Sequence, residues 1–517
     1  MNRNIRKNNY ANQFTIILFV AIIVNLVCYA LPDSILGISI KKVDLLSDIR
    51  KPSQNNTQSS SLFADIEVED EIYPTDSLLN PNDANLTTLN AETTIPSRSP
   101  NNTQRNTDSS DNRTTDNTGS NNADNAVNPE NRTADNTGAR RTGNFNPNNK
   151  LIEDFSSGHT GLSRFFYALN NIDNLGRPVR IAFVGDSFIE GDILVADFRA
   201  KMQAQFGGRG VGFIPVTSVT EQYRPTIKQS SDGWKTYSII KDKNRKYVLS
   251  GVQFEPSAQN ASIRFQTVDM YPGLEEVSSL KFIYSKNEDT DLVLNIDDET
   301  MSFKLQPTET VTQFELTGHF RKGLLQFKNA QGLKAIGIAL EDNYGVIVDN
   351  FSLRGNSGII MSELDSESCR NLQQIRPYDL IVLQYGLNVA NEDVQEYGWY
   401  RNRMVPVIEH IQNCFPGADI LILSVSDRSR NGQSTMPAVV SLLRAQRQMA
   451  ESAEVAFWSI FAAMGGENSM IRYVDSNWAS KDYTHLSFRG GREIAHALFD
   501  ALITEKNLYA DNENQTD

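Results

Sequence analysis

One serine and one histidine of this sequence stand in surroundings that suit nucleophilic chemistry. Ser187 ends the stretch VRIAFVGDS, in which an apolar run typical of a buried strand stops at a Gly-Asp-Ser turn. His485 stands in KDYTHLSFRGG, with Asp482 three residues earlier. A serine hydroxyl becomes a strong nucleophile when an imidazole takes its proton and a carboxylate orients that imidazole. The sequence therefore predicts a Ser187–His485–Asp482 triad, provided that the fold brings the three together.

Two further loops carry groups that can stabilise the negative charge formed when a serine attacks an ester carbonyl. The stretch FSLRGNSG contains Gly355 and Asn356, and YGLNVAN contains Gly386 and Asn388. Backbone N–H groups and asparagine amides are common donors in oxyanion holes. A glycine N–H and an asparagine amide from these loops are expected to join the N–H of Ser187 in such a hole.

The remaining histidines are weaker candidates for a catalytic base. His496 lies within the last expected helix, away from its apolar face, and is interpreted as a surface residue. His159, His319 and His410 have no neighbouring acid in a loop comparable to that of His485. The search for a base therefore ends at His485.

No metal or cofactor is expected. Glu190 and Asp192 suit the first turn of a helix, where the helix dipole favours acids, and no second cluster of ligands accompanies them. The glycine run at 207–212 follows a helix instead of preceding one, so it is interpreted as a helix stop and not as a phosphate loop.

The elements that must position these residues alternate between strands and helices. Continuous apolar runs are RIAFV, YDLIVLQY, ADILILSV and VAFWSI. Amphipathic helices are expected between them over residues 192–206, 358–375, 392–414, 436–451 and 487–505. This alternation indicates an α/β fold, a doubly wound parallel sheet covered by helices on both faces. Active sites of such sheets lie at the carboxyl ends of the strands, where Ser187 is expected.

The alternation stops between residues 216 and 346. This segment contains alternating strand patterns such as ASIRFQTV and LVLNIDDETMSFKLQ, with Asp297 and Asp298 as turn residues. It predicts an inserted all-β module of sandwich type.

The order of these motifs resembles that of the SGNH (GDSL-type) hydrolase family. Gly-Asp-Ser, a glycine loop, Gly-x-Asn and Asp-x-x-His follow one another over residues 177–505, with the β module set aside. The resemblance implies that Ser187 is the nucleophile, that Asp482 and His485 complete the triad, and that Ser187, Gly355 and Asn388 form the oxyanion hole. The stretch FGGRGVGF and the inserted module look like the peptidoglycan O-acetylesterase branch. The third motif, Gly-Leu-Asn-Val, lacks the acid that usually follows the asparagine.

The N-terminal region carries a membrane or export signal. Residues 14–31, FTIILFVAIIVNLVCYAL, are apolar and about long enough to cross a bilayer, and Arg3, Arg6 and Lys7 precede them. The positive-inside rule then places the rest of the chain on the exported, periplasmic or extracellular, side of the cell membrane. A single-pass anchor is favoured; cleavage after Ala30 and secretion is the alternative.

Composition completes the predicted organisation. Residues from about 51 to 150 are dominated by Asn, Thr, Ser, Asp and Pro, which cannot bury enough surface to fold. The predicted divisions are a cytoplasmic tail with anchor or signal at 1–32, a disordered tether at 33–150, the hydrolase domain at 151–215 and 347–506, the β module at 216–346, and a flexible tail at 507–517. Carbohydrate binding is the role considered for the β module.

Charge and cysteine content exclude other classes. With 517 residues and a formal net charge of −14, the chain lacks the basic clusters that a nucleic-acid partner requires. Its three cysteines are too few for a disulfide framework. The expected protein is an exported serine esterase that removes O-acetyl or other small acyl groups from a polysaccharide. The alternatives are an inactive glycan-binding or envelope assembly protein on the same fold, and a lipase-like esterase; the oligomeric state stays open.

Overall fold

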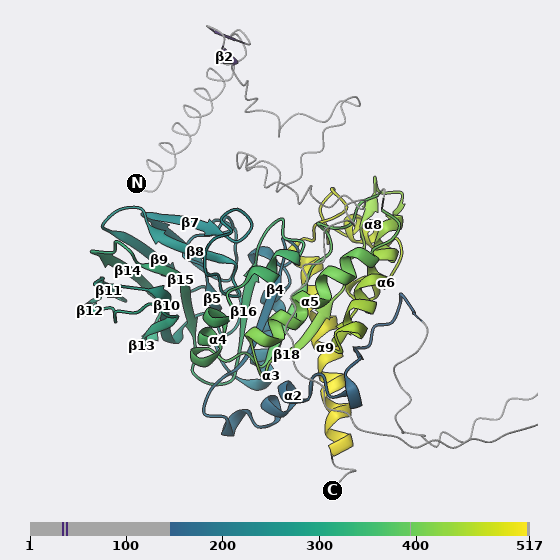
Figure 1. Cartoon of the computed structure of the whole chain (residues 1–517), viewed down its shortest axis with the longest axis horizontal. Coiled ribbons are helices and arrows are strands. Elements are labelled where there is room, and N and C mark those ends of the chain that lie inside the picture. Colours follow the sequence, from purple (N-terminus) through teal and green to yellow (C-terminus); the bar gives the residue numbers. More distant parts are fainter. Residues whose placement is uncertain (1–33, 36–37, 40–144, 393, 514–517) are drawn as a thin grey trace, which may run out of the picture. The chain divides into compact units, whose positions relative to one another are not determined.

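The computed structural model describes residues 34–35, 38–39, 145–392 and 394–513 of the chain. Residues Ser34–Ile35 (β1) and Ile38–Ser39 (β2) form a short antiparallel pair. The rest of the described chain contains an α/β part and a β-rich part, which lie at the right and left of Figure 1, respectively.

The centre of the α/β part is a mostly parallel sheet. Its five parallel strands run in the order β16-β4-β17-β18-β21, and β3 pairs antiparallel with β21 at one edge. By position in the chain this order is 2-1-3-4-5, that of flavodoxin-like doubly wound folds. The strands are β3 (Glu153–Asp154), β4 (Val179–Gly185), β16 (Val346–Ser352), β17 (Leu380–Gln384), β18 (Asp419–Leu423) and β21 (Ala456–Trp458). The parallel sheet predicted from the apolar runs is confirmed.

Two groups of helices pack around this sheet. Helix α3 packs on α9 and β16, and α2 contacts α9 and β4; α5 packs on both α4 and α6. The chain crosses from β4 to its neighbour β16, and then crosses back past β4 to β17. Because these crossovers run in opposite directions along the sheet and are right-handed, they place the two groups of helices on opposite faces. The helices are α2 (Ser163–Asn170), α3 (Val195–Phe206), α4 (Ser366–Ile375), α5 (Gly398–Cys414), α6 (Pro437–Ser452), α7 (Ile460–Met464), α8 (Ser469–Asp475) and α9 (Phe488–Glu513).

Three predicted helices begin later than expected, and two of them do so for a local reason. The helix expected from 192 is α3, because Gly191 and Asp192 adopt positive φ and end a short 3-10 turn. The helix expected from 358 divides at Asp365, whose carboxylate caps the N-terminus of α4 by accepting from the Ser368 N–H at 2.9 Å. The helix expected from 392 is α5, which begins at Gly398.

The predicted ends of the folded region are also corrected. Residues 145–150, assigned to the tether, pack on the α/β part: the Trp458 indole donates to the Lys150 carbonyl at 3.0 Å. The Arg444 guanidinium lies 5.1 Å from the centre of the Phe145 ring. At the other end, α9 continues to Glu513 through part of the expected tail at 507–517. Its Tyr509 ring packs against Phe166 of α2, with centroids 5.9 Å apart, which supports the added turns.

The β-rich part consists of two antiparallel sheets. The first has the order β13-β10-β15-β8-β7, with β5 (Gly212–Ile214) also paired to β15. The second has the order β12-β11-β14-β9-β6. The strands of the first are β7 (Trp234–Ser238), β8 (Val252–Pro256), β10 (Val277–Lys286), β13 (Thr312–Phe320) and β15 (Lys334–Glu341); those of the second are β6 (Lys228–Asp232), β9 (Ala261–Gln266), β11 (Asp291–Ile296), β12 (Glu299–Lys304) and β14 (Lys322–Lys328).

Alternating burial along the strands of the second sheet explains how the two sheets pack. Along β9, Ile263 and Phe265 are buried while Arg264 and Gln266 are exposed. The inward residues meet those of the first sheet, as Phe327 meets Phe282 with ring centroids 4.6 Å apart. The first sheet is buried on both faces along most of β10 and β15, so its outer face is covered too. The β-sheet content predicted for this segment is therefore confirmed, and the outer face of the second sheet stays open.

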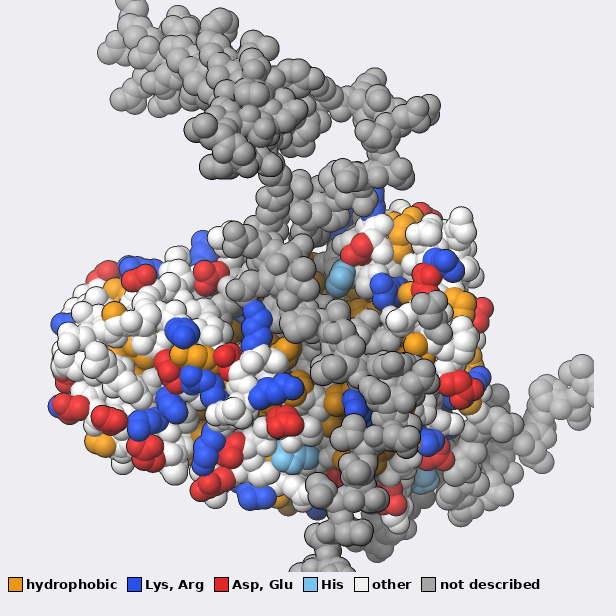
Figure 2. All heavy atoms as spheres, turned by 45° about the horizontal axis from the view of Figure 1, so that its top comes forward, with side chains coloured by type: hydrophobic (Ala, Val, Ile, Leu, Met, Phe, Trp, Pro, Cys, Tyr) orange, Lys and Arg blue, Asp and Glu red, His pale blue; other side chains and the backbone are white. Residues whose placement is uncertain are grey.

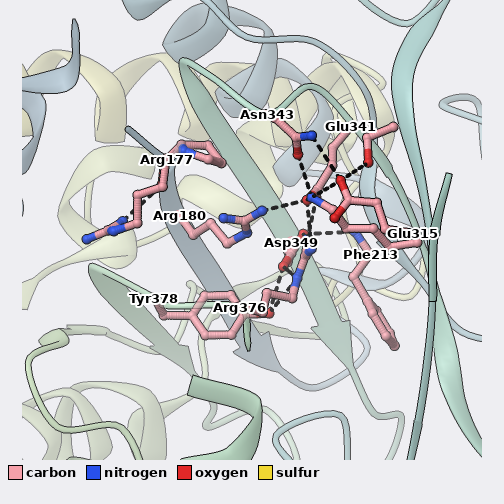
Figure 3. Close-up of polar contacts among 12 residues, drawn as sticks. Arg177, Arg180, Phe213, Glu315, Glu341, Asn343, Asp349, Arg376 and Tyr378 are labelled. Carbon is pink, nitrogen blue, oxygen red and sulfur yellow. Dashed lines mark hydrogen bonds and ion pairs between the residues drawn. The ribbon is translucent and has the colours of Figure 1, made fainter. Parts of the chain in front are cut away.

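A buried ion cluster lies where the two parts meet (Figure 3). The carboxylate of Glu341 on β15 pairs with Arg180 of β4 at 2.6 Å, with Arg376 at 2.6 Å, and with Lys281 of β10 at 2.7 Å. Asp349 of β16 pairs with the same Arg376 at 2.8 Å. Burial raises the pKa of Glu341, but the three cations outweigh it and hold that pKa well below the ordinary value. The cluster ties the sheet of the α/β part to the first sheet of the β-rich part.

The predicted segments at 1–32 and most of 33–150 lie outside the described residues, and so does the candidate membrane segment at 14–31. Within the described ranges, none of the helices has both the length and the apolar character that a membrane crossing requires.

Candidate active site

The serine predicted as nucleophile follows β4, an inner strand of the parallel sheet. All seven residues of β4 are buried, and Ser187 lies two residues beyond its carboxyl end. Strand β4 has β16 on one side and β17 on the other, so Ser187 stands where the winding of the sheet reverses. Ligands of open α/β sheets bind in the crevice that this reversal creates.

The turn that presents Ser187 is held by close packing and by Asp186. A Cβ atom at Gly185 would lie 2.6 Å from the Gln384 carbonyl oxygen of β17, so only glycine fits there. The Asp186 carboxylate, itself fully buried, accepts a hydrogen bond from the Phe188 N–H at 2.9 Å. The turn therefore leaves Ser187 half-buried at the end of the strand.

The histidine loop before α9 folds as the Asp-x-x-His spacing predicted. The Asp482 carboxylate lies 2.7 Å from the Nδ1 atom of His485 and also accepts from the backbone N–H groups of His485 and Thr484, at 3.0 and 2.9 Å. Burial opposes ionisation of Asp482, but these hydrogen bonds outweigh it and lower its pKa below the ordinary value. Asp482 is thus an ionised acceptor for Nδ1–H, which leaves Nε2 as the basic nitrogen of the neutral ring.

The structure brings this basic nitrogen to the serine. The His485 Nε2 atom lies 3.4 Å from the Ser187 Oγ atom, although the two residues are 298 positions apart in the chain. This is slightly longer than an ideal hydrogen bond, as is common before substrate binds. The side chains of Asp482 and His485 are 44% and 46% exposed, so solvent water can reach the site.

The predicted oxyanion donors lie in exposed loops after neighbouring strands. Gly355 follows β16 with φ +75°, and Asn388 follows β17. Within the described residues, the backbone N–H groups of Ser187 and Gly355 donate no hydrogen bond. The Asn388 amide donates to the Asp186 carboxylate at 3.0 Å and to the Asn356 carbonyl at 3.2 Å. Two of the three donors are therefore free, and the third is held in place by the residue that precedes the serine.

The sequence reasoning missed the role of Asp186 in this arrangement. Its carboxylate joins the serine turn to the Asn388 loop by accepting from both. Burial raises its pKa to about 7, against the opposing effects of the Phe188 N–H, the nearby His485 and the Asn388 amide. The sequence did contain one indication of this role, the acid at the centre of Gly-Asp-Ser next to an apolar run. An acid buried at such a place needs hydrogen-bond partners.

The acids that follow the serine pair with arginines. Glu190 forms an ion pair with Arg354 at 2.5 Å, and the buried Asp192 forms ion pairs with Arg199 at 3.1 Å and with Arg224 at 2.9 Å. The described residues contain no group of three or more histidine, cysteine or acidic side chains that could hold a metal ion.

Three of the other four histidines that the structure describes have partners away from the serine. His319 lies 3.0 Å from the Glu276 carboxylate in the β-rich part, and His410 contacts the Leu364 carbonyl at 2.9 Å. His159 contacts the Asp154 carbonyl at 2.9 Å. None of the three shares a hydrogen bond with Ser187.

Replacing Asp186 by asparagine should change how stability depends on pH. The folded-state pKa of Asp186 is raised from 3.8 to about 7, so its contribution to stability is complete below pH 4 and is lost as pH rises to about 7. At about 1.4 kcal/mol per pH unit, the loss is of the order of 4 kcal/mol. The measurement is the melting temperature of wild type minus that of Asp186→Asn, which should fall between pH 4 and pH 7 and then level off.

This difference isolates Asp186 from other titrating groups. Asp419, whose pKa burial also raises to about 7, contributes equally to both proteins and cancels. A difference in melting temperature that stays constant, or that rises with pH, would show that Asp186 is not an acid of raised pKa.

Comparison with known proteins places this geometry on a known fold. No family model matches the chain, and no curated protein matches it. A solved structure of a peptidoglycan O-acetylesterase superposes on 69% of this chain and 99% of its own, with 20% identity and a TM-score of 0.56. A family two carbohydrate esterase from Cellvibrio japonicus aligns over 54% of this chain and 99% of its own, with 10% identity and a TM-score of 0.24. A putative GDSL-like lipase from Parabacteroides merdae aligns over 30% and 72%, with 14% identity and a TM-score of 0.25.

The first of these similarities identifies the class of fold. The chain shares the α/β fold of the solved peptidoglycan O-acetylesterase, which agrees with the fold class predicted from the sequence. The shared fold extends over nearly the whole of the solved peptidoglycan O-acetylesterase.

Proposed function

We propose that this chain is a serine esterase that removes O-acetyl or other small acyl groups from a polysaccharide. The observation that carries the proposal is the continuous set of contacts from Asp482 to His485 at 2.7 Å and from His485 to Ser187 at 3.4 Å. The fold shared with a peptidoglycan O-acetylesterase supports an acetylated carbohydrate as substrate.

The first half of the proposed reaction forms an acyl-enzyme. The Ser187 Oγ atom attacks the ester carbonyl carbon while His485 Nε2 takes its proton. The carbonyl π electrons move to oxygen, and the N–H groups of Ser187 and Gly355 stabilise the resulting oxyanion. The Asn388 amide joins them by exchanging its contact with the Asn356 carbonyl for the oxyanion while it keeps its contact with Asp186. Collapse breaks the bond to the sugar oxygen, which takes the proton from His485 and leaves as a hydroxyl.

The second half hydrolyses the acyl-enzyme. A water molecule enters through the exposed side of His485, loses a proton to Nε2 and attacks the acyl carbon. The second tetrahedral intermediate uses the same donors and expels Ser187 Oγ, which regains its proton from His485. Asp482 stays ionised throughout and stabilises the imidazolium that forms in each half.

The direct test measures acetate release from O-acetylated peptidoglycan and turnover of p-nitrophenyl esters from acetate to octanoate. The proposal expects acetate release and a preference for the shortest chains. A preference for long acyl chains would favour the lipase-like alternative. Undetectable hydrolysis of every ester, with glycan binding retained, would favour the inactive binding protein.

Replacing Asn388 by alanine should lower kcat about a hundredfold with little change in KM. The side-chain donor acts on charge that exists only in the transition state, so its loss affects the chemical step more than substrate binding. The measurement is the steady-state kinetics of p-nitrophenyl acetate. Wild-type kcat in Asn388→Ala would remove this residue from the oxyanion hole and leave its contact with Asp186 as purely structural.

We also propose that residues 14–31 anchor the chain in the cell membrane and that the esterase works on the exported side, beyond the tether. Their apolar run and the preceding basic residues support this proposal. Full-length chain should remain in the membrane fraction after a high-salt wash, whereas a chain lacking residues 1–32 should be soluble. Recovery of a full-length product truncated near Ala30 in the soluble fraction would show cleavage and secretion instead.

A further inference from the structure

The open face of the second β sheet carries a groove, and the residues that line it do not include Ser187 or its partners. It has a volume of about 350 Å³. The side chains that line it come from four adjacent strands, β6, β9, β14 and β11, and include Lys228, Ser230, Arg264, Gln266, Leu324 and Asn295. A volume of this size matches that of small-ligand sites in proteins.

The register of the strands explains how these side chains meet. Gln266 of β9 is opposite Lys228 of β6 on one side and Lys322 of β14 on the other. Arg264 is two residues along β9, in the next row, opposite Ser230 and Leu324. Since residues two apart on a strand share a face, Arg264 is diagonal to both lysines, at a separation that long side chains can bridge.

Cations outnumber carboxylates in this groove, because Lys228, Arg264 and Lys322 line it together with Asp297 and Asp298. Within the described residues, Lys228 and Arg264 form no ion pair or hydrogen bond through their side chains. Both acids lie in the groove itself and are already engaged there: Asp298 pairs with Lys322 at 3.0 Å, and Asp297 accepts from the backbone N–H of Lys322 at 3.0 Å. Two cations are therefore available to an external anion.

This imbalance is local. Figure 2 shows basic and acidic side chains interspersed over the left-hand part of the molecule, without one large patch of a single sign on the face shown. In a chain of formal net charge −14, a groove that presents two unpaired cations selects an acidic ligand by charge complementarity.

The lining also indicates what else the ligand carries. Phe265, the aromatic residue among those lining the groove, points into the core and is 1% exposed, so it offers no ring for a sugar to stack on. Ser230 and Gln266 offer hydroxyl and amide groups, which suit sugar hydroxyls. Without a stacking platform, most of the affinity must come from the cations.

We propose that this groove binds a carboxylate-bearing sugar of a polysaccharide, with Arg264 and Lys228 as the carboxylate ligands. The inference rests on the proposed function, because it takes the bound polymer to be the one that carries the ester. It adds that the polymer is acidic and that the β-rich part holds it at a site separate from Ser187.

The test measures binding of the full-length protein to polygalacturonate, with neutral dextran and dextran sulfate as comparison polymers. Polygalacturonate should bind, dextran should not, and binding should weaken as salt is raised. Arg264→Gln should weaken binding to polygalacturonate about tenfold or more, since it removes a charged hydrogen-bond donor, and Lys228→Gln should weaken it less. Lys328→Gln, at an exposed position at the other end of β14, is the matched control and should bind as wild type.

The outcomes separate this inference from the esterase proposal. All three variants should hydrolyse p-nitrophenyl acetate at the wild-type rate, because this small ester needs only the serine site. Three results would overturn the groove as a carboxylate site. The first is equal binding of polygalacturonate by Arg264→Gln and wild type, the second is an equal weakening by Lys328→Gln, and the third is binding of dextran sulfate alone. Absence of p-nitrophenyl acetate hydrolysis in wild type would instead overturn the esterase, whatever the binding result.

Discussion

Replacing Ser187 by alanine should lower kcat for p-nitrophenyl acetate by about 10⁴-fold or more while leaving the fold intact. Ser187 supplies the atom that becomes bonded to the acyl group, so without it the acyl-enzyme route is closed. The remaining oxyanion donors can still assist attack by water, which sets a small residual rate. Ser187 is half-buried at the end of β4 and its hydroxyl contacts only His485 among the described side chains, so its loss leaves no buried group unpaired.

Two companion variants show whether the serine works with its partners. His485→Ala should reduce kcat nearly as far as Ser187→Ala, and the double variant should be no slower than either, because the residues act as one unit. Asp482→Asn should have a smaller effect, since the base remains but loses the carboxylate at 2.7 Å that orients it. Additive losses in the double variant would mean that Ser187 and His485 act independently.

Replacing Glu341 by glutamine should destabilise the folded protein by about 3 kcal/mol or more. Glu341 is fully buried and pairs with Arg180, Arg376 and Lys281 (Figure 3). Neutralising it leaves these buried cations without their shared partner, and breaking a buried pair costs far more than breaking one in water. The measurement is the free energy of unfolding in urea at pH 7, or the corresponding fall in melting temperature.

An exposed pair provides the matched control. Glu309, which is 74% exposed, pairs with Lys286 at 2.9 Å, and Glu309→Gln should change stability by less than about 1 kcal/mol. The contribution of Glu341 should also depend on pH. Because its folded-state pKa lies below the ordinary value, the stabilisation is present above about pH 4.5 and is lost as pH falls further. Equal effects of Glu341→Gln and Glu309→Gln would contradict the role of the buried cluster.

The sequence predicted the parts of the fold that bury apolar side chains in a regular pattern. Strands β4, β17 and β18 are buried at every position, so they appear in the sequence as unbroken apolar runs. The turn at Asp297 and Asp298 was also predictable from the sequence, because aspartate is favoured in short hairpin turns. Both residues adopt the positive φ that such turns require. Strand β6 gave no such signal, because none of its residues is buried and it is held only by pairing at a sheet edge.

For the candidate site, the sequence indicated which residues to examine but not how they are held together. The short spacing from Asp482 to His485 was sufficient to predict their contact, which is local. The contact of Ser187 with His485 depends on the whole sheet and was available from sequence only through the order of the motifs. The link from Asp186 to Asn388 and the Glu341 cluster join residues far apart in the chain, and no periodicity records such contacts.

The most direct test of the central claim is covalent labelling with an organophosphonate fluoride, which reacts with serines activated by a neighbouring base. Mass spectrometry of the intact wild-type protein should show one adduct per chain, and peptide mapping should locate it on Ser187. Ser187→Ala and His485→Ala should remain unlabelled under the same conditions. A wild-type chain that takes up no label, or an adduct that persists in Ser187→Ala, would contradict the account.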